Sequence, residues 1–257
     1  MNYIQYEISD RIGYITLNRP EKRNALSHEL VAELKQAFDQ AAKDEQVKVV
    51  VLRAHGEAFC AGADLAYLQK LQRFSYEENV ADSNHLKELF LKIYTFNKVV
   101  IAQIQGHALA GGCGLAAVCD FSFAVREAKF GYTEVKIGFI PAIVMVFLLR
   151  RLGEAKSKQL LLSGDLVSAE EAQEQGLINY ITTADNLESD VRNFATRLVT
   201  TNSAQSMSTT KQMIAAVQSM SLEQSLEYAS VMNAKARASE DCQRGIAAFL
   251  NKEKIIW

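Results

Sequence analysis

Two short runs of the chain, residues 47–52 and 99–104, are apolar at nearly every position and rich in β-branched side chains. A strand with one face in water alternates polar and apolar residues, whereas a strand buried on both faces is almost continuously apolar. Strands of the second kind belong to parallel sheets, because the crossover helices between them cover both faces. The two runs therefore predict an α/β fold around a parallel sheet.

The first 126 residues predict strands and helices in alternation. Ser27 stands at an expected N-cap, and Ser75 is followed three residues later by a glutamate, which is the spacing of a capping box. Residues 55–65 and 106–114 are predicted to be loops rich in small side chains. The predicted strands span residues 3–8, 13–17, 47–52, 99–104 and 120–125, and the predicted helices span residues 28–43 and 75–96.

Beyond residue 142 the chain is predicted to be helical, apart from one strand near residues 178–181. Ser168 and Ser221 begin two further capping boxes. No internal repeat and no linker rich in proline or serine divides the chain. We expect residues 1–200 to form the core that carries the functional site, and residues 201–257 to form a helical C-terminal region.

The charge balance and the apolar runs argue against two classes of partner. Lysine and arginine total 28, and aspartate and glutamate total 30, so the formal net charge of -2 gives no general attraction to nucleic acid or to an anionic membrane. The longest apolar run, residues 137–149, contains a glycine and a proline and is shorter than the about 20 residues that a membrane-spanning helix needs. We expect no nucleic-acid partner and no membrane span.

The cysteines predict neither a disulfide framework nor a metal site. Cys60, Cys113, Cys119 and Cys242 form no Cys-x-x-Cys pair and are sparse for this length. The first three have apolar neighbours, which is typical of small core residues rather than of nucleophiles or metal ligands. No leader with a basic and an apolar part opens the sequence, and we expect a cytoplasmic protein.

The first candidate site segment is residues 58–65, which follow a predicted buried strand. Ligands of open α/β sheets bind at the carboxyl ends of the strands. Ala61, Gly62 and Ala63 have little or no side chain, so a ligand can approach the backbone and accept a hydrogen bond from the amide of Ala63. The alternative is a tight turn into a helix, with Asp64 as the N-cap.

The second segment, residues 106–115, also follows a buried strand and leads into a helix. Free amides at a helix start suit an anion or a developing enolate, and Gly111 is the natural donor. The alternative is that these glycines only let the helix pack closely on a strand. The segment matches neither the dinucleotide fingerprint nor the P-loop motif.

The third segment, residues 130–141, holds Glu134 among apolar and turn residues. Burial in such a setting raises the pKa of a carboxyl group and suits it to exchange protons near neutral pH. Tyr132 and Thr133 precede it and are expected to line the pocket, with plain packing as the alternative. The alternative for Glu134 is a salt bridge to Lys136 or an ordinary helix cap.

Together, these segments resemble the pattern of the enoyl-CoA hydratase/isomerase family, also called the crotonase superfamily. The pattern joins residues 61–64, the turn at residues 111–113 about fifty residues later, and Glu134 about twenty residues beyond it. The resemblance implies a crotonase-like α/β spiral of ββα repeats, with a helical C-terminal region that assembles a homotrimer or homohexamer. It covers nearly the whole chain and is also carried by Ile12 and by residues 18–20, 24–26, 163–165, 169–172, 176–177 and 249–252.

The resemblance implies that the main-chain amides of Ala63 and Gly111 polarise the carbonyl group of an acyl-CoA thioester. Each donor of such an oxyanion hole is typically worth about 2.7 to 4 kcal/mol at the transition state. Glu134 matches one of the two acids of family hydratases, and coenzyme A is part of the substrate, so no separate cofactor is implied. The implied substrate-binding residues are Ala61, Gly62, Asp64, Leu65, Gly112, Tyr132 and Thr133.

Position 114 departs from the hydratase pattern of the family. Hydratases carry their other acid there, in a Gly-Gly-Cys-Glu helix start, whereas this chain has Gly114. Two groups of the family resemble the one-acid pattern. Bacterial methylglutaconyl-CoA hydratase-like proteins share a Gly-x-Gly-Leu helix start and a segment similar to residues 133–142. In Δ3,Δ2-enoyl-CoA isomerases, one glutamate moves a proton between two carbons and activates no water.

The resemblance around residues 133–142 favours hydration of a methylglutaconyl-CoA-like 2-enoyl-CoA, with isomerisation as the alternative. A third possibility is a relative without activity that binds acyl-CoA or RNA, although the charge of -2 argues against RNA. A set of basic residues is predicted to be solvated surface, with the phosphates of coenzyme A as the alternative contact: Arg19, Lys22, Arg23, Lys252 and Lys254.

Overall fold

The computed structural model describes residues 1–257 and has a six-stranded sheet at its centre, in the order β1-β2-β3-β5-β7-β10. Strand β1 is antiparallel to β2, and every other neighbouring pair is parallel. The predicted parallel sheet is therefore confirmed, and the first two predicted strands form a hairpin. The strands are β1 (Ile4–Ser9), β2 (Ile12–Leu17), β3 (Val49–Ala54), β5 (Val99–Ile104), β7 (Phe121–Val125) and β10 (Tyr180–Thr182).

The continuous apolar runs are buried as their composition predicts. Residues 49–52 of β3 and 100–102 of β5 have no exposed surface. Helix α1 (His28–Lys43) packs against β1 and β2, and α7 (Leu187–Thr201) packs against β2, β3, β5 and β7. Both predicted N-caps are present, because the Ser27 hydroxyl accepts from the Leu30 amide and Ser75 forms a capping box at the start of α3 (Tyr76–Tyr94).

A second, smaller sheet was not predicted. It has the order β4-β6-β8-β9, with strands β4 (Ala58–Cys60), β6 (His107–Leu109), β8 (Lys129–Gly131) and β9 (Val167–Ser168). Strands β4 and β6 lie in the segments 55–65 and 106–114, which were predicted as loops, and a strand of three residues is too short to show an alternating pattern. Each of β4, β6 and β8 directly follows a long strand of the first sheet, so the expected ββα repeats are present.

The last third of the chain is helical, as predicted. Ser168 and Ser221 form their capping boxes, and the short helix α2 (Leu65–Leu71) follows Asp64, as the alternative interpretation of residues 58–65 predicted. None of the helices is long and apolar enough to cross a membrane. The helices are α4 (Gly111–Val118), α5 (Ala142–Ser163), α6 (Ala169–Gln175), α8 (Ala204–Val217), α9 (Leu222–Arg237) and α10 (Glu240–Leu250).

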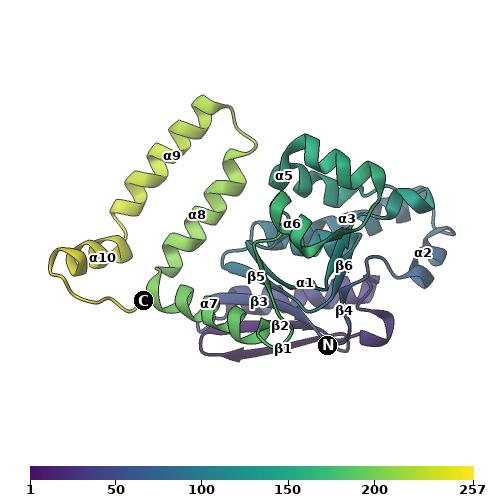
Figure 1. Cartoon of the computed structure of the whole chain (residues 1–257). Helices are drawn as coiled ribbons and strands as arrows, with labels where there is room; N and C mark the ends of the chain where they lie inside the picture. The colour runs from purple at the N-terminus through teal and green to yellow at the C-terminus, as the bar shows by residue number, and fades with distance from the viewer.

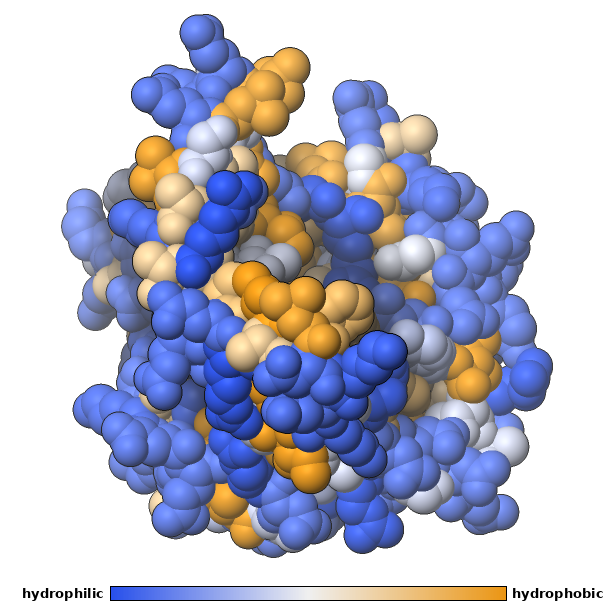
Figure 2. Space-filling view, turned by 90° about the vertical axis from the view of Figure 1, so that its left-hand side faces the viewer, coloured by the Kyte–Doolittle hydropathy of each residue, from blue (hydrophilic) through white to orange (hydrophobic).

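Helices α8 to α10 form an arm that extends away from the sheets (Figure 1). The chain turns into this arm at Asn202 and Ser203, next to the boundary expected after residue 200. Seen from the side of the arm, apolar surface lies between hydrophilic residues (Figure 2). Exposed apolar residues on α9 and α10 include Leu222, Phe249 and Leu250.

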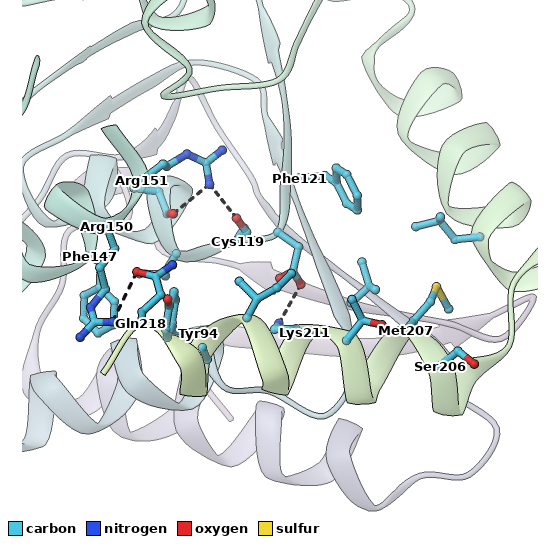
Figure 3. Close-up of a pocket in the computed structure, with 18 of the residues that line it drawn as sticks. Tyr94, Cys119, Phe121, Phe147, Arg150, Arg151, Ser206, Met207, Lys211 and Gln218 are labelled. Atoms are coloured by element: carbon cyan, nitrogen blue, oxygen red, sulfur yellow. Dashed lines mark hydrogen bonds and ion pairs between the residues drawn. The ribbon is translucent and has the colours of Figure 1, made fainter. Parts of the chain in front are cut away.

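A single buried side chain anchors α8 to the core, and that side chain is a lysine. The Lys211 ammonium donates to the Asp120 carboxylate at 2.7 Å, and to the carbonyl oxygens of Ile93 at 3.1 Å and Lys98 at 3.2 Å. Figure 3 shows this ion pair on the inner side of α8, beside a mainly apolar cavity of about 570 Å³ between α8 and the core. The one buried side chain of α8 is thus held by charge and hydrogen bonds, and the partly buried Met207 of the same helix packs against the core.

Candidate active site

The loop after β4 is held by a main-chain pairing with Leu26. The Leu26 amide donates to the Gly62 carbonyl at 2.7 Å, and the Asp64 amide donates to the Leu26 carbonyl at 2.9 Å. Because a trans peptide points its carbonyl and its amide hydrogen in opposite directions, the Ala63 amide points away from Leu26. No hydrogen bond in the structure uses that amide, so it is free to bind a ligand.

The start of α4 supplies a second free amide. The Ala110 amide donates to the Gly131 carbonyl at 2.7 Å, and Ala110 itself has a φ of 50°, which is uncommon for a residue with a side chain. Gly111 follows as the first residue of the helix, where an amide has no partner within the helix. The positive end of the helix dipole lies behind this amide and favours a negative charge in front of it.

The structure brings these two turns into contact. A Cβ atom on Gly62 would lie 2.7 Å from the Cβ of Ala110 and 3.5 Å from the nitrogen of Gly111. Gly62 has a φ of 91°, which also favours glycine. A Cβ on Gly112 would lie 2.1 Å from the carbonyl oxygen of Cys60, so that glycine lets α4 lie directly on β4. The glycine-rich turn therefore permits close packing and also leaves the amide of Gly111 without a partner in the helix, while the role of this amide as a donor to a ligand stays a prediction.

Glu134 begins the short 3-10 helix that follows β8, at residues Glu134–Ile137. Its Oε2 atom is buried and has no hydrogen-bond partner. Burial raises the pKa of this carboxyl group above its usual value. Lys136 pairs instead with Asp165, at 3.1 Å, so the alternative of a Glu134–Lys136 salt bridge is wrong. The carboxyl group is therefore available for proton transfer.

Hydrocarbon fills the space beside Gly114. Gly114 lies three residues after Gly111, on the same face of α4. A Cβ at this position would lie 2.3 Å from the Cγ1 of Val144 and 2.9 Å from the Cε1 of Phe90. Val144 comes from α5 and Phe90 from α3, and both are buried. The place of the second family acid is thus closed by apolar side chains and has no room for a carboxylate.

The structure changes the expectation for two of the predicted substrate-binding residues. Tyr132 is fully buried in the core and has no surface with which to line a pocket. Asp64 is buried as well, and its carboxylate caps α2 by accepting from the amides of Ala66 and Tyr67, as the alternative interpretation predicted. Burial would raise the pKa of Asp64, but the amide bonds and the Arg19 guanidinium outweigh it and lower the pKa.

The remaining predicted residues take different places around the two turns. Ala63 and Leu65 are exposed, Ala61 and Thr133 are half-buried, and Gly112 is buried against β4. Burial raises the pKa of the thiols of Cys60, Cys113 and Cys119 to about 12, which agrees with their prediction as core residues.

Sequence reasoning missed the role of Arg19 and the partners of Gly114. Arg19 was predicted to be a solvated residue or a phosphate contact, but its side chain is only 15% exposed and its Nη1 atom lies 2.7 Å from Asp64. Arg19 belongs to the Asn18-Arg19-Pro20 segment that contributes to the family resemblance, but this segment does not indicate which residue pairs with the arginine. Val144 and Phe90 gave no signal, because only the folded chain brings them next to Gly114.

A sequence profile of the family described as "Enoyl-CoA hydratase/isomerase" matches residues 7–257, which include all of these sites and extend to the last residue of the chain. The chain belongs to the enoyl-CoA hydratase/isomerase family. A Thermus thermophilus protein that bears an enoyl-CoA hydratase name is 42% identical over 241 residues, which cover 94% of this chain and 95% of that protein. The 2,3-dehydroadipyl-CoA hydratase of Escherichia coli is 31% identical over 244 residues, which cover 94% of this chain and 93% of that protein.

Solved structures agree with this family membership. An enoyl-CoA hydratase of Shewanella pealeana has a TM-score of 0.93 at 30% sequence identity, and the match covers 99% of this chain and 96% of that one. An enoyl-CoA hydratase of Mycobacterium smegmatis has a TM-score of 0.93 at 29% identity, covering 100% and 99% of the two chains. This chain is therefore an enzyme of the enoyl-CoA hydratase/isomerase family with the crotonase fold.

Proposed function

We propose that this enzyme hydrates a 2-enoyl-CoA, with its thioester oxygen bound by the amides of Ala63 and Gly111 and with Glu134 as the single acid/base. The observation that carries the proposal is the carboxyl oxygen of Glu134, which is buried and has no hydrogen-bond partner. The free amides of Ala63 and Gly111 lie in two turns that contact each other. The site residues come from three ββα repeats of one family fold.

In the proposed reaction, Glu134 accepts a proton from water while the water oxygen forms a bond to C3 of the acyl chain. The electron pair of the C2–C3 double bond moves to form an enolate, whose negative charge develops on the thioester oxygen. The two amides stabilise that charge, at about 2.7 to 4 kcal/mol for each donor. Glu134 then returns the proton to C2. A carboxyl group with a raised pKa suits both transfers near neutral pH.

For the substrate we propose a methylglutaconyl-CoA-like thioester. The support is the resemblance of residues 133–142 to the methylglutaconyl-CoA hydratase-like group, together with the single acid. The relative from Escherichia coli is named for a thioester of another dicarboxylic acid. The test is a comparison of kcat/KM for straight-chain, branched and 3-methylglutaconyl thioesters, and an equal or higher value for a straight-chain thioester would reject the substrate.

Isomerisation of a 3-enoyl-CoA is the second candidate, and one observation favours it. Val144 and Phe90 close the space beside Gly114, so a water molecule there would meet carbon atoms rather than a second carboxylate. An isomerase needs no such water. Incubation of 2-enoyl-CoA and 3-enoyl-CoA in ¹⁸O-labelled water separates the two reactions, because only hydration places the label in the product.

Replacement of Glu134 tests both catalytic proposals. We expect Glu134→Gln to lower kcat by about 10²- to 10⁴-fold, the usual contribution of a positioned acid/base. The exposed Glu127→Gln is the matched control and should leave kcat unchanged. Wild-type turnover by a folded Glu134→Gln variant would reject this assignment. If no thioester reacts with the wild-type enzyme while coenzyme A still binds, the protein is a binding relative without catalysis.

We also propose that the arm of helices α8 to α10 assembles the enzyme into a homotrimer or homohexamer. The support is the exposed apolar surface of α9 and α10, which includes Leu222, Phe249 and Leu250. Sedimentation equilibrium of the wild-type enzyme and of Phe249→Glu tests the assembly, and a monomeric wild-type enzyme would reject it.

A further inference from the structure

The carboxylate of Asp64 joins three parts of the chain next to Ala63. Its Oδ1 atom accepts from the amides of Ala66 at 2.8 Å and Tyr67 at 3.1 Å, which fixes the start of α2. Its Oδ2 atom lies 2.7 Å from Nη1 of Arg19. The side chains of Arg19 and Asp64 are 15% and 7% exposed, so the charges of the pair are largely withdrawn from solvent.

Arg19 is itself held at both ends. Its backbone amide donates to Oδ1 of Asn24 at 2.9 Å. The side-chain amide of Asn24 donates in turn to the carbonyl oxygens of His55 at 2.8 Å and Ala58 at 2.9 Å. At the other end, the guanidinium carbon lies 5.2 Å from the centroid of the Tyr3 ring, which is within the range of a cation–π contact. The guanidinium is therefore a fixed point relative to β3 and β4.

The pairing with Leu26 connects this fixed point to the Ala63 amide. Leu26 binds the Gly62 carbonyl on one side of Ala63 and the Asp64 amide on the other. The N–H group of Ala63 lies in the Gly62–Ala63 peptide plane, and the Ala63–Asp64 plane meets that plane at the Cα atom of Ala63, so Leu26 holds one plane on each side of this residue. A shift of the Asp64 side chain would turn the second plane and release α2, which begins at the next residue.

We propose that Arg19 is a positioning residue, which holds Asp64 and thereby fixes the direction of the Ala63 amide. The inference rests on the proposed role of that amide in the oxyanion hole. Arg19 itself touches neither substrate nor reacting atoms in this assignment. Its charge is used within the protein, so it contributes little to binding the phosphates of coenzyme A.

The direct test is the carbonyl stretching frequency of [1-¹³C]butyryl-CoA, measured by difference infrared spectroscopy. This thioester has no double bond to hydrate, and hydrogen bonds to its carbonyl oxygen lower the frequency. We expect the wild-type enzyme to lower the frequency on binding. We expect Arg19→Met to lose at least half of that shift, and Arg19→Lys to keep more of it than Arg19→Met.

Kinetics of the same variants separate positioning from substrate binding. We expect Arg19→Met to lower kcat about tenfold to a hundredfold, less than the 10²- to 10³-fold loss of a whole oxyanion donor, with KM changed by less than about threefold. Asp64→Asn keeps an oxygen to cap α2 and removes the ion pair, so its effect should not add to that of Arg19→Met. Arg126→Gln removes an exposed arginine that pairs with Glu170; it is the control and should leave both measurements unchanged.

Each outcome decides between the assignments. An Arg19→Met variant that raises KM alone, or that lowers kcat while keeping the full infrared shift, would overturn the positioning role. If the wild-type enzyme binds butyryl-CoA without any shift, the oxyanion hole and with it the proposed function fail, whatever the variants do. Should Arg19→Met not fold, Arg19→Lys and Asp64→Asn give the same comparison.

Discussion

Lys211 offers the sharpest test of how the helical arm is attached. Lys211→Met keeps the aliphatic length of the side chain and removes the ammonium group. Asp120 then loses its charged partner at 2.7 Å and keeps one donor, the Val100 amide, which also lies at 2.7 Å. Breaking a buried ion pair from one side costs about 3 to 5 kcal/mol, because a charge is left without compensation.

The exposure of the pair places the expected loss at the lower end of that range. The side chain of Lys211 is 8% exposed and that of Asp120 is 24% exposed, so water can partly solvate the remaining carboxylate. We expect the free energy of unfolding to fall by about 3 kcal/mol at pH 7. For a chain of this size, this corresponds to a decrease in Tm of about 6 to 12 °C.

The loss should also depend on pH. Burial raises the pKa of Asp120 in the folded protein, even beside Lys211. A carboxyl group with a higher pKa in the folded than in the unfolded state destabilises the fold when it ionises. The protonated carboxyl group therefore contributes to the stability of the fold. This contribution is fully present below the unfolded pKa of about 3.9 and is lost as the pH rises through the folded pKa. Removal of Lys211 raises the folded pKa further, so the deficit of Lys211→Met should shrink as the pH falls from 7 toward 4.

Urea unfolding followed by circular dichroism, at one fixed protein concentration, measures these effects. The double variant Lys211→Met/Asp120→Asn should be more stable than Lys211→Met, since a neutral amide replaces the unpaired charge. The control is Lys158→Met, which breaks an exposed pair with Glu154 and should cost less than about 1 kcal/mol. A Lys211→Met variant as stable as the control, or no recovery in the double variant, would refute the reasoning.

Three further predictions concern the active site. Gly112→Ala places a methyl group 2.1 Å from the Cys60 carbonyl oxygen, so we expect a loss of several kcal/mol, seen as a large drop in Tm or as insoluble protein. The raised pKa of Glu134 predicts that kcat/KM falls with decreasing pH, through a midpoint above the usual pKa of glutamate. Glu134→Gln should remove this pH dependence. A midpoint at or below the usual pKa of glutamate would contradict the prediction. Gly114→Glu should destabilise the fold without adding hydration activity, because Val144 and Phe90 occupy the space. Addition of Val144→Ala to this variant should recover part of the lost Tm. A stable and more active Gly114→Glu variant would show that the space is open.

The long elements could be predicted because their signals are local. Continuous apolar runs identified β3 and β5, and serine caps identified the starts of α1, α3, α6 and α9. The strands β4, β6 and β8 have three residues each, which is too few to show a repeated alternation of polar and apolar side chains, and they are stabilised by pairing with each other across the fold. Helix α2 has seven residues and buries none of them, and only its cap at Asp64 indicated it.

The candidate site was predictable where it depends on small residues and less so where it depends on contacts. Ala63 and Gly111 stood out because loops without side chains follow buried strands. The ion pair of Arg19 with Asp64 joins residues that are 45 positions apart in the chain, and neither residue type nor sequence context indicates that the two side chains pair. Tyr132 directly follows β8, and a strand of three residues does not indicate from its sequence whether the next side chain points into the core.

The two free amides belong to the backbone, and this has a consequence for how the enzyme can diverge. Exchange of the side chain at position 63 leaves the N–H group in place, provided that the new residue is small enough not to obstruct the ligand. The residues that face the acyl chain can therefore change, and position 114 can hold a glycine, while the two amides that we propose as thioester donors stay in place. A change of reaction within this fold needs few substitutions for that reason.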